Sequence, residues 1–493
     1  MPKKPNLWAF HTIDYRMPFT FLFRFAILVS LFFCSVFFSE RTKIATSPLA
    51  FPGAEGYGKF ASGGRGGMVY IVSNLNDSGL GSLRWALEAS GPRTVVFEVS
   101  GNIVLNRPIN VRNPHLTIAG QTAPGEGITI SNHSLNFVNM HNVIVRFIRF
   151  RTGDTSGKQG NAGYGVYMDN AIFDHCTFSW GTDEVASFYA VRNFTMQWCI
   201  ISEALNNSVH EKGPHGYGGI VGGRDVSWHH NLIAHATQRM VRFDHPDLYK
   251  SEKELLTWRG ITDFRNNVIY NWSERAASGG AEGVFNVVNN YFKPGPATLP
   301  SAKSIILTPQ HTGNGKTFAF GKFFLNGNIL EGNPTVSENN WLGARLGSTA
   351  LTQEFLESVK AKGEFPIKEG LYDTFESAAS AYEIVLFHAG ASLHRDPIDA
   401  RIVQETRNGS YTFQGSKGSK GGIIDSQNDV GGWPELISLL APKDTDRDGI
   451  PDSWEVEKGL NPERRDDRLY NLDNRYTNLE VYLNWLVEHH IKK

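Results

Sequence analysis

A chain of 493 residues can bury a large core, and this length favours one big domain accompanied by a small module. With a formal net charge of −1, the chain has no overall positive potential that would attract nucleic acid or an anionic membrane. An anionic ligand would therefore need a local basic patch. Fifty glycines and 12% aromatic residues, with few long amphipathic runs, favour β-structure with many turns.

The first fifty residues differ from the rest of the chain. Residues 1–6 (MPKKPN) are basic, and residues 19–38 (FTFLFRFAILVSLFFCSVFF) are apolar apart from Arg24. We interpret residues 1–45 as an export signal, which predicts a secreted, extracellular protein, with the cell surface or the periplasm as the other possible locations. An uncleaved membrane anchor is the competing interpretation, because the apolar run approaches the length that spans a bilayer.

Six segments share a pattern. Most begin at a polar residue, continue with mixed apolar and polar residues, and then pass a small or amide residue into another apolar pair. The shortest spacing, from Thr262 to Val284, is 22 residues, and the longer spacings leave room for loops. A short repeat with variable insertions predicts a parallel β-helix with one coil per repeat. A β-sandwich with chance similarity is the alternative, although its hairpins need no repeat of this length. The segments begin at Asn142, Asn170, Asn193, Asp225, Thr262 and Val284.

Stacked coils place equivalent residues above one another. The seventh position of the repeat predicts Cys176 above Cys199, as a bonded pair or as two small buried side chains. With an offset of one residue in the fifth segment, the same position predicts a ladder of asparagines at Asn231, Asn267 and Asn290.

Residues 174–245 are rich in histidine but lack the spacing of a zinc motif. Because neighbouring side chains of a strand point to opposite faces, His229 and His230 are expected to point apart and to share no metal. By the same rule, Cys176 should point inward and His175 outward, which argues against a cysteine–histidine nucleophile pair.

Charged residues gather on adjacent repeats of the same region. Lys212, Arg239 and Arg242 form a basic group on coils next to the coil that carries Asp183 and Glu184. Carboxylates and bases on one face of a parallel sheet indicate calcium-mediated binding of an anionic polymer. An elongated β-helix also suits an extended chain substrate.

Beyond about residue 330 the repeat fades. Residues 352–363 and 374–390 have helical patterns, and such segments can cover the open edges of a β-helix. Residues 441–493 then introduce a different module, which a helix over 476–490 is expected to close.

The module begins with DTDRDGIPDSWE, residues 444–455, which fits D-x-D-x-D-G-x₅-E without a mismatch. Gly449 permits the sharp turn, and Ile450 would offer its carbonyl. A solvated acidic loop is the alternative, but the spacing predicts a structural EF-hand-like calcium (Ca2+) site that resembles thrombospondin type 3 or dockerin modules. Its expected ligands are Asp444, Asp446, Asp448, Asp452 and Glu455.

Four runs carry a more specific resemblance: FPGAEGYG (51–58), DHCTFSWGTDEV (174–185), HEKGPHGYGG (210–219) and QRMVRF (238–243). They resemble the pectate lyases of polysaccharide lyase family 1. The resemblance covers residues 51–330 and extends plausibly to about 440, which assigns 51–440 to one domain. It implies an all-β, right-handed parallel β-helix and β-elimination on polygalacturonate, leaving a 4,5-unsaturated end.

The resemblance also implies residue roles. Arg239 matches the base, although arginine's high pKa then requires a desolvated, cation-rich site or a transfer coupled to substrate binding. Calcium would neutralise a uronate carboxylate and acidify the C5 proton. The implied substrate-binding residues are Lys212, Arg242, His210 and His215, and the implied calcium ligands are Asp183, Glu184 and Asn161.

The sequence departs from the family's pattern at three positions. Ser187 stands where the second acid of a D-x-x-x-D pair is expected, Val241 replaces a proline, and Asp244 replaces an arginine. Arg242 is the nearest substitute for that arginine, and Asn161 is the nearest oxygen ligand upstream.

The sequence therefore predicts a secreted, monomeric pectate lyase that binds polygalacturonate and calcium and no nucleic acid. A β-helical glycoside hydrolase is one alternative, but its "NTD" and "GHG" signatures are absent. A non-catalytic carbohydrate-binding β-helix protein is the other, since acidic ligands of the family are missing.

Overall fold

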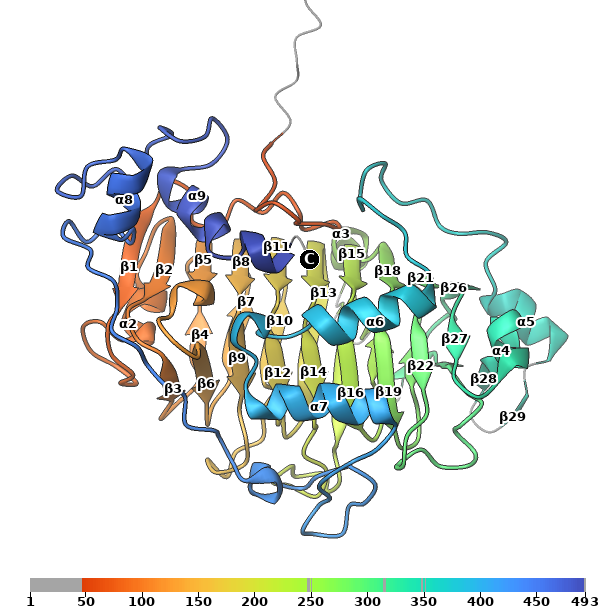
Figure 1. Cartoon of the computed structure of the whole chain (residues 1–493). Coiled ribbons are helices and arrows are strands. Elements are labelled where there is room, and N and C mark those ends of the chain that lie inside the picture. Colours follow the sequence, from red (N-terminus) through yellow and green to blue (C-terminus); the bar gives the residue numbers. More distant parts are fainter. Residues whose placement is uncertain are drawn as a thin grey trace, which may run out of the picture. The chain divides into compact units, whose positions relative to one another are not determined.

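The strands stack in parallel, coil upon coil, into two long sheets (Figure 1). The computed structural model describes residues 47–245, 249, 251–313, 316–346, 349–350 and 352–491, and Pro48–Lys493 forms one unit. The predicted export segment, residues 1–45, lies outside the described residues. Along the chain, one or two strands of the larger sheet are followed by one strand of the smaller sheet, coil after coil, so the described chain forms the predicted parallel β-helix.

The main path of the sixteen-stranded sheet is β1-β2-β5-β8-β11-β13-β15-β17-β20-β23, and all ladders within this sheet are parallel. Its strands are β1 (Met68–Val72), β2 (Arg93–Phe97), β4 (Ile109–Val111), β5 (Leu116–Ala119), β7 (Leu135–Val138), β8 (His141–Arg146), β10 (Gly163–Val166), β11 (Asp169–Asp174), β13 (Glu184–Gln197), β15 (Tyr217–His229), β17 (Val241–Phe243), β18 (Ile261–Arg265), β20 (Ala277–Gly279), β21 (Val284–Val288), β23 (Leu307–Pro309) and β26 (Lys322–Asn326).

The nine-stranded sheet runs β27-β22-β19-β16-β14-β12-β9-β6-β3. Its strands are β3 (Gly101–Val104), β6 (Ile128–Ser131), β9 (Ile148–Arg151), β12 (Thr177–Ser179), β14 (Ile200–Ser202), β16 (Leu232–Ala236), β19 (Val268–Trp272), β22 (Tyr291–Lys293) and β27 (Ile329–Leu330). Two short antiparallel pairs lie outside the sheets: β24 (Thr312–Gly313) with β25 (Lys316–Thr317), and β28 (Arg345–Leu346) with β29 (Thr349–Ala350).

Each predicted repeat spans a corner where the chain passes from the first sheet to the second. One residue at each corner has a left-handed backbone, with φ between 51° and 56°. This break in the strand makes one prediction wrong: the Nδ1 atoms of His229 and His230 lie 2.8 Å apart, because His230 occupies a corner. The corner residues are Phe147, His175, Trp198, His230, Asn266 and Asn289.

The stacking of equivalent residues is confirmed. Thr177 is in register with Ile200, which places Cys176 at the level of Cys199, and both cysteines are buried free thiols. In the asparagine ladder each Nδ2 donates to the Oδ1 of the next asparagine over 2.9–3.0 Å, and the ladder continues past the three predicted residues. Its members are Asn231, Asn267, Asn290, Asn328 and Asn340.

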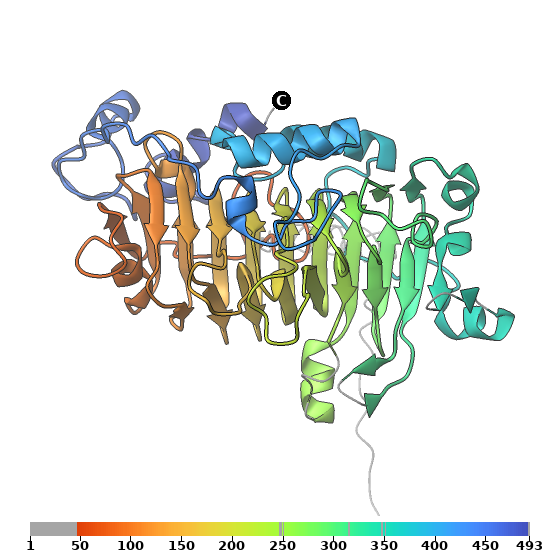
Figure 2. The same ribbon diagram turned by 90° about the horizontal axis from the view of Figure 1, so that it is seen from below.

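Helices from the last third of the chain cover the coils (Figure 1). The apolar faces of α6 (Ala378–His388) and α7 (Pro397–Asn408) pack on the outer side of the nine-stranded sheet, against Ile200, Leu232 and Val268. Seen from below, the blue α6 and α7 lie on one side of the stacked strands, and the yellow-green α3 (Glu252–Trp258) lies on the opposite side (Figure 2). The helices predicted over 352–363 and 374–390 correspond to α5 (Gln353–Val359) and α6.

The C-terminal residues return to the first coils. Ile450, Trp454 and Leu479 pack against Val69 and Val96 of β1 and β2. Among the residues that the structure describes, no helix is both long and apolar enough to cross a membrane. The other α-helices of the described residues are α2 (Leu83–Glu88), α4 (Pro334–Glu338), α8 (Asp452–Lys458), α9 (Asn478–Trp485) and α10 (Glu488–Ile491).

Candidate active site and cation sites

Arg239 lies at the centre of a group of candidate residues on the sixteen-stranded sheet. Its Nη1 donates to Oε1 of Glu184, and its guanidinium carbon lies 4.3 Å from the centre of the Tyr217 ring. Glu184 and Tyr217 begin the neighbouring strands β13 and β15 and are in register. Adjacent coils therefore fix the guanidinium by a carboxylate and by an aromatic ring.

Asp183 has different partners from Glu184. The Nε2 atoms of His215 and His210 lie 3.0 and 3.6 Å from its Oδ1, and the two imidazole rings stack with centroids 3.7 Å apart. The side chain of Asp183 is 35% exposed, whereas that of Glu184 is 8% exposed. The two neighbouring carboxylates thus have different environments, since that of Asp183 faces solvent and that of Glu184 is buried against Arg239.

The charge states of this site follow from burial and from these contacts. Burial and the neighbouring Asp183 raise the pKa of Glu184, although Arg239 opposes the shift. Burial also raises the pKa of Asp183, but the hydrogen bond from His215 and the nearby cations outweigh it and lower this pKa overall. Burial and the His215 charge lower the pKa of His210. The site therefore combines an anionic, accessible carboxylate with a buried carboxylate that takes up a proton more readily.

The other predicted residues surround this centre. Asn161 lies beside it, since its Oδ1 accepts the backbone N–H of Glu184 over 3.3 Å. The backbone N–H of Lys212 donates to His210, and the Lys212 residue is exposed. Arg242 lies on β17, in register with Ile220. The structure thus brings together six predicted residues: Asn161, Asp183, Glu184, His210, His215 and Arg239. Lys212 lies next to His210, and Arg242 lies on β17, which pairs with β15.

Asp244 explains one departure from the family's pattern. It is 2% exposed, and its carboxylate accepts hydrogen bonds from Arg259 Nε over 2.8 Å and from the Tyr249 hydroxyl over 3.1 Å. An arginine at this position would meet another arginine instead of a carboxylate. The position has a structural role in this chain.

Two tyrosines near the acids were missed by sequence reasoning. The rings of Tyr164 and Tyr189 contact each other edge to face at 6.1 Å, and the Tyr189 ring also contacts His245. Burial raises the pKa of Tyr164, and the charges of Glu184 and Asp183 raise it further. The signal that could have identified Tyr164 is its register with Ser187, three residues after Glu184 on β13.

The oxygen atoms of this site suit a hard cation. Asp183 and Glu184 carry carboxylates and Asn161 an amide oxygen, which are the ligand types that calcium prefers. Asp183 offers the most accessible of these oxygens, since Glu184 is engaged by Arg239.

A second group of carboxylates converges in the C-terminal loop. Ligand oxygens of Asp444, Asp446 and Asp448 lie within 4.8 Å of one another, and so do those of Asp448, Glu455 and Asp466. Glu455 is fully buried, and neither of its oxygens has a hydrogen-bond partner among the described residues. Such a carboxylate is costly unless a cation or a proton compensates it.

Charge repulsion in this group is strong. Burial, followed by the neighbouring carboxylates, raises the pKa of Glu455 to about 8, and burial with the neighbouring carboxylates raises that of Asp448 to about 7. Asp466, which is 1% exposed, joins the group without a motif that predicted it. The predicted ligand Asp452 is placed elsewhere, because its carboxylate accepts hydrogen bonds from Thr445 and Lys443.

Several known proteins that are similar to this chain carry the same name. "Probable pectate lyase C" of Aspergillus flavus is 37% identical over 449 residues, which cover 89% of this chain and 94% of that protein. The proteins of the same name from Aspergillus oryzae and Neosartorya fischeri are 36% and 34% identical, over 89% and 90% of this chain and 94% and 96% of theirs. No protein-family model matches the chain.

Solved structures also resemble the chain. The cedar pollen allergen jun a 1 is 17% identical with a TM-score of 0.47, covering 68% of this chain and 92% of that one. Pectate lyase C from Erwinia chrysanthemi is 16% identical with a TM-score of 0.42, covering 69% of this chain and 97% of that one.

Proposed function

The chain belongs to the pectate lyase family and is a polysaccharide lyase, and we propose that it cleaves polygalacturonate by β-elimination with Arg239 as the base. The observation that carries this proposal is the placement of Arg239, whose guanidinium is held by Glu184 and Tyr217 beside the accessible carboxylate of Asp183. The Arg239 guanidinium can bind a uronate carboxylate, and it also lies in contact with the Glu184 carboxylate, which can accept a proton.

Glu184 addresses the difficulty of using an arginine as a base. A guanidinium has no free lone pair, so it can accept the C5 proton only if it releases another proton. We propose that Nη1 passes a proton to Glu184 as the guanidinium takes the C5 proton, while the electron pair of the C5–H bond forms the C4–C5 double bond. The C4 oxygen leaves with the electron pair of the C4–O bond and takes up a proton from water. The raised pKa of Glu184 favours its role as the acceptor.

The remaining residues bind and orient the substrate in this proposal. Lys212 and Arg242 supply cations for uronate carboxylates, and His210 and His215 position Asp183 and line the binding site. Asp183, with Asn161 and Glu184 nearby, would hold calcium; when bound, this ion neutralises the uronate carboxylate and acidifies the C5 proton. The lowered pKa of Asp183 keeps its carboxylate anionic for that purpose.

The product identifies the reaction. The chain without its first 45 residues, mixed with polygalacturonate and calcium, should release a 4,5-unsaturated uronide that absorbs ultraviolet light. Arg239→Ala should lower this rate at least about a hundredfold, the loss expected for a general base. Arg107→Ala, at an exposed arginine paired with Glu88, is the matched control and should retain the rate. New reducing ends without ultraviolet absorbance would contradict β-elimination, and an active Arg239→Ala variant would contradict the assignment of the base.

We further propose that residues 441–493 form a structural calcium module beside the catalytic domain over 51–440, and that the enzyme is secreted as a monomer. The buried carboxylate of Glu455, without a hydrogen-bond partner among the described residues, supports a cation there. The proposed ligands are Asp444, Asp446, Asp448, Glu455 and Asp466, with Asp452 contributing at most through water. Secretion rests on the signal-like segment over residues 1–45.

A further inference from the structure

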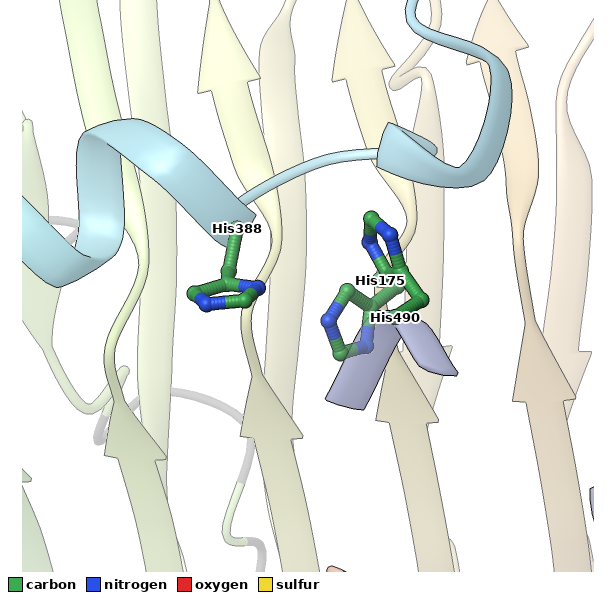
Figure 3. Close-up of side chains that lie close together, drawn as sticks. All are labelled: His175, His388 and His490. Atoms are coloured by element: carbon green, nitrogen blue, oxygen red, sulfur yellow. The ribbon is translucent and has the colours of Figure 1, made fainter. Parts of the chain in front are cut away.

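Three histidines from distant parts of the chain meet on the outside of the β-helix (Figure 3). His175 is the corner residue between β11 and β12, His388 ends α6, and His490 lies in α10. The His490 ring centre lies 5.8 Å from that of His175 and 5.7 Å from that of His388. One nitrogen from each ring lies within 4.8 Å of the other two. His175 is only 4% exposed, because these later segments cover its outward face.

A serine fixes the tautomer of His490. The Ser392 hydroxyl donates its one proton to the backbone carbonyl of His388 over 2.6 Å. Its oxygen also lies 2.8 Å from Nε2 of His490, so Nε2 must be the donor in this second contact. Nδ1 of the neutral His490 ring therefore carries a lone pair.

A buried aspartate fixes the tautomer of His175 in the same way. Nδ1 of His175 lies 2.8 Å from Oδ1 of Asp174, whose carboxylate is also held by Arg146 and Gln197 at 2.7 and 2.8 Å. Because Arg146 and Gln197 both donate to the Asp174 carboxylate, its oxygens act as acceptors. Nδ1 is therefore the donor to Asp174, which leaves Nε2 as the ring nitrogen that can face a ligand.

We propose that His175, His388 and His490 bind one divalent transition-metal ion, of which zinc is the best fit. Imidazole nitrogens suit zinc, whereas calcium requires oxygens, so this site is chemically distinct from the two carboxylate sites. The carboxylate of Asp174 behind His175 is the typical support of a metal-bound histidine. Three protein ligands leave a fourth position for water.

The surroundings allow an ion to enter. A cavity of about 370 Å³ adjoins the group and is lined by His490, Ser392 and Arg395, among others. The Arg395 guanidinium carries a positive charge, but it donates to the carbonyls of Leu386, Phe387 and Ala389 at the end of α6. The bound ion would tie α10 and the end of α6 to the coil corner at His175.

Zinc binding can be measured directly on the full chain without its first 45 residues, prepared without a histidine tag. Excess calcium keeps the carboxylate sites occupied, and the protein is dialysed against zinc before metal analysis. We expect one zinc per chain in the wild type and in His489→Gln, the matched control on the same helix. His388→Gln and His490→Gln should each lose the zinc, and Ser392→Ala should weaken binding by roughly ten- to a hundredfold.

The lyase activity and the circular dichroism of each variant show whether it is folded, since none of these residues lies in the proposed active site around Arg239. If His388→Gln fails to fold, His490→Gln at the partly exposed end of the chain decides alone. Folded wild-type protein without stoichiometric zinc would overturn the proposal, and so would zinc retained by His490→Gln. Replacement of zinc by cobalt gives an independent spectrum, which should be that of a tetrahedral site.

Discussion

In the proposed active site, two carboxylates that are neighbours in the chain have different roles. Glu184 is buried and holds Arg239, whereas Asp183 is accessible and lies against His215. The difference in burial decides which carboxylate can accept a proton and which can meet a cation from solvent. Substitutions of the two residues should therefore affect different kinetic constants.

Glu184→Gln removes the proposed proton acceptor but keeps the shape of the side chain. We expect kcat to fall about a hundredfold, within the range for acid–base catalysis, while KM changes little. Steady-state kinetics on polygalacturonate measures both constants, and circular dichroism verifies the fold. A variant with wild-type kcat would show that Arg239 does not pass its proton to Glu184.

Asp183→Asn should instead change the requirement for calcium. Loss of one charge-assisted contact of about 1.4 kcal/mol corresponds to about a tenfold higher calcium concentration at half-maximal rate. A calcium titration of the rate at fixed polygalacturonate measures this shift. An unchanged titration curve would remove Asp183 from the set of calcium ligands.

At the scale of the elements, the corners between sheets set how the coils stack. Sequence reasoning predicted the register, because a repeat of equivalent residues carries it directly, and the cysteine and asparagine stacks follow. The corners could not be predicted, since Phe147, His175, Trp198 and His230 have left-handed backbones without being glycine or asparagine. The wrong expectation for His229 and His230 arose there, because strand alternation ends at a corner.

The asparagine ladder should be a large source of stability. Asn267 is fully buried; its Nδ2 donates to Trp228 O and Asn290 Oδ1, and its Oδ1 accepts from Asn231. Asn267→Ala leaves several buried groups unpaired, and we expect the free energy of unfolding to fall by at least about 3 kcal/mol. Denaturant unfolding measures the loss.

The control for this substitution is Asn136→Ala, because Asn136 forms an equivalent but solvent-exposed pair with Asn110. Its cost should stay below about 1 kcal/mol, since water replaces the lost hydrogen bond. Equal losses for the two variants would contradict the importance of burial.

Helix α7 is attached to the sheet by an acid-sensitive contact. Glu405 lies 3.1 Å from Nε2 of His235 and accepts the N–H of Thr412 over 2.8 Å. Burial raises the pKa of Glu405, but the contact with His235 and the other donors outweigh it and lower this pKa to about 2 from 4.5. A lowered carboxyl pKa stabilises the fold above the unfolded value, and this contribution is lost as pH falls from about 4.5 to about 2.

Glu405→Gln should therefore be less stable than the wild type by about 3 kcal/mol at pH 7, and the difference should disappear near pH 2. Urea unfolding across this pH range measures it. A difference that is constant with pH would contradict the assigned ionisation.

For the whole molecule, the described chain combines the predicted β-helix with a carboxylate-rich segment on its first coils. The internal repeat predicted the β-helix, and the spacing of acidic residues in 444–455 predicted the second part. It could not predict that Asp466 joins the loop or that three histidines from separate segments meet, because such contacts depend on how the covering segments return along the coils. The expected right-handed winding stays a prediction.

Removal of calcium should loosen the end of the molecule that holds β1. Without a cation, the carboxylates around Glu455 repel one another, and the segment that covers β1 and β2 loses its internal support. We expect a chelator to lower Tm by several degrees and to speed hydrogen exchange of the β1 amides before those of the central coils.

Glu455→Gln tests the same effect without a chelator, because it removes one proposed ligand. Its Tm should respond to calcium less than that of the wild type. A wild-type Tm that ignores both calcium and chelator would contradict a structural calcium site.

The segment that returns along the β-helix also determines when folding can finish during synthesis. Arg65 near the first coil pairs with Glu480 over 2.8 Å, although 415 residues separate them in the chain. The first strands leave the ribosome well before the segment that covers them, since Glu480 is made 415 residues after Arg65. The first coil therefore has an uncovered end, where other chains can pair with β1, until this later segment has been made.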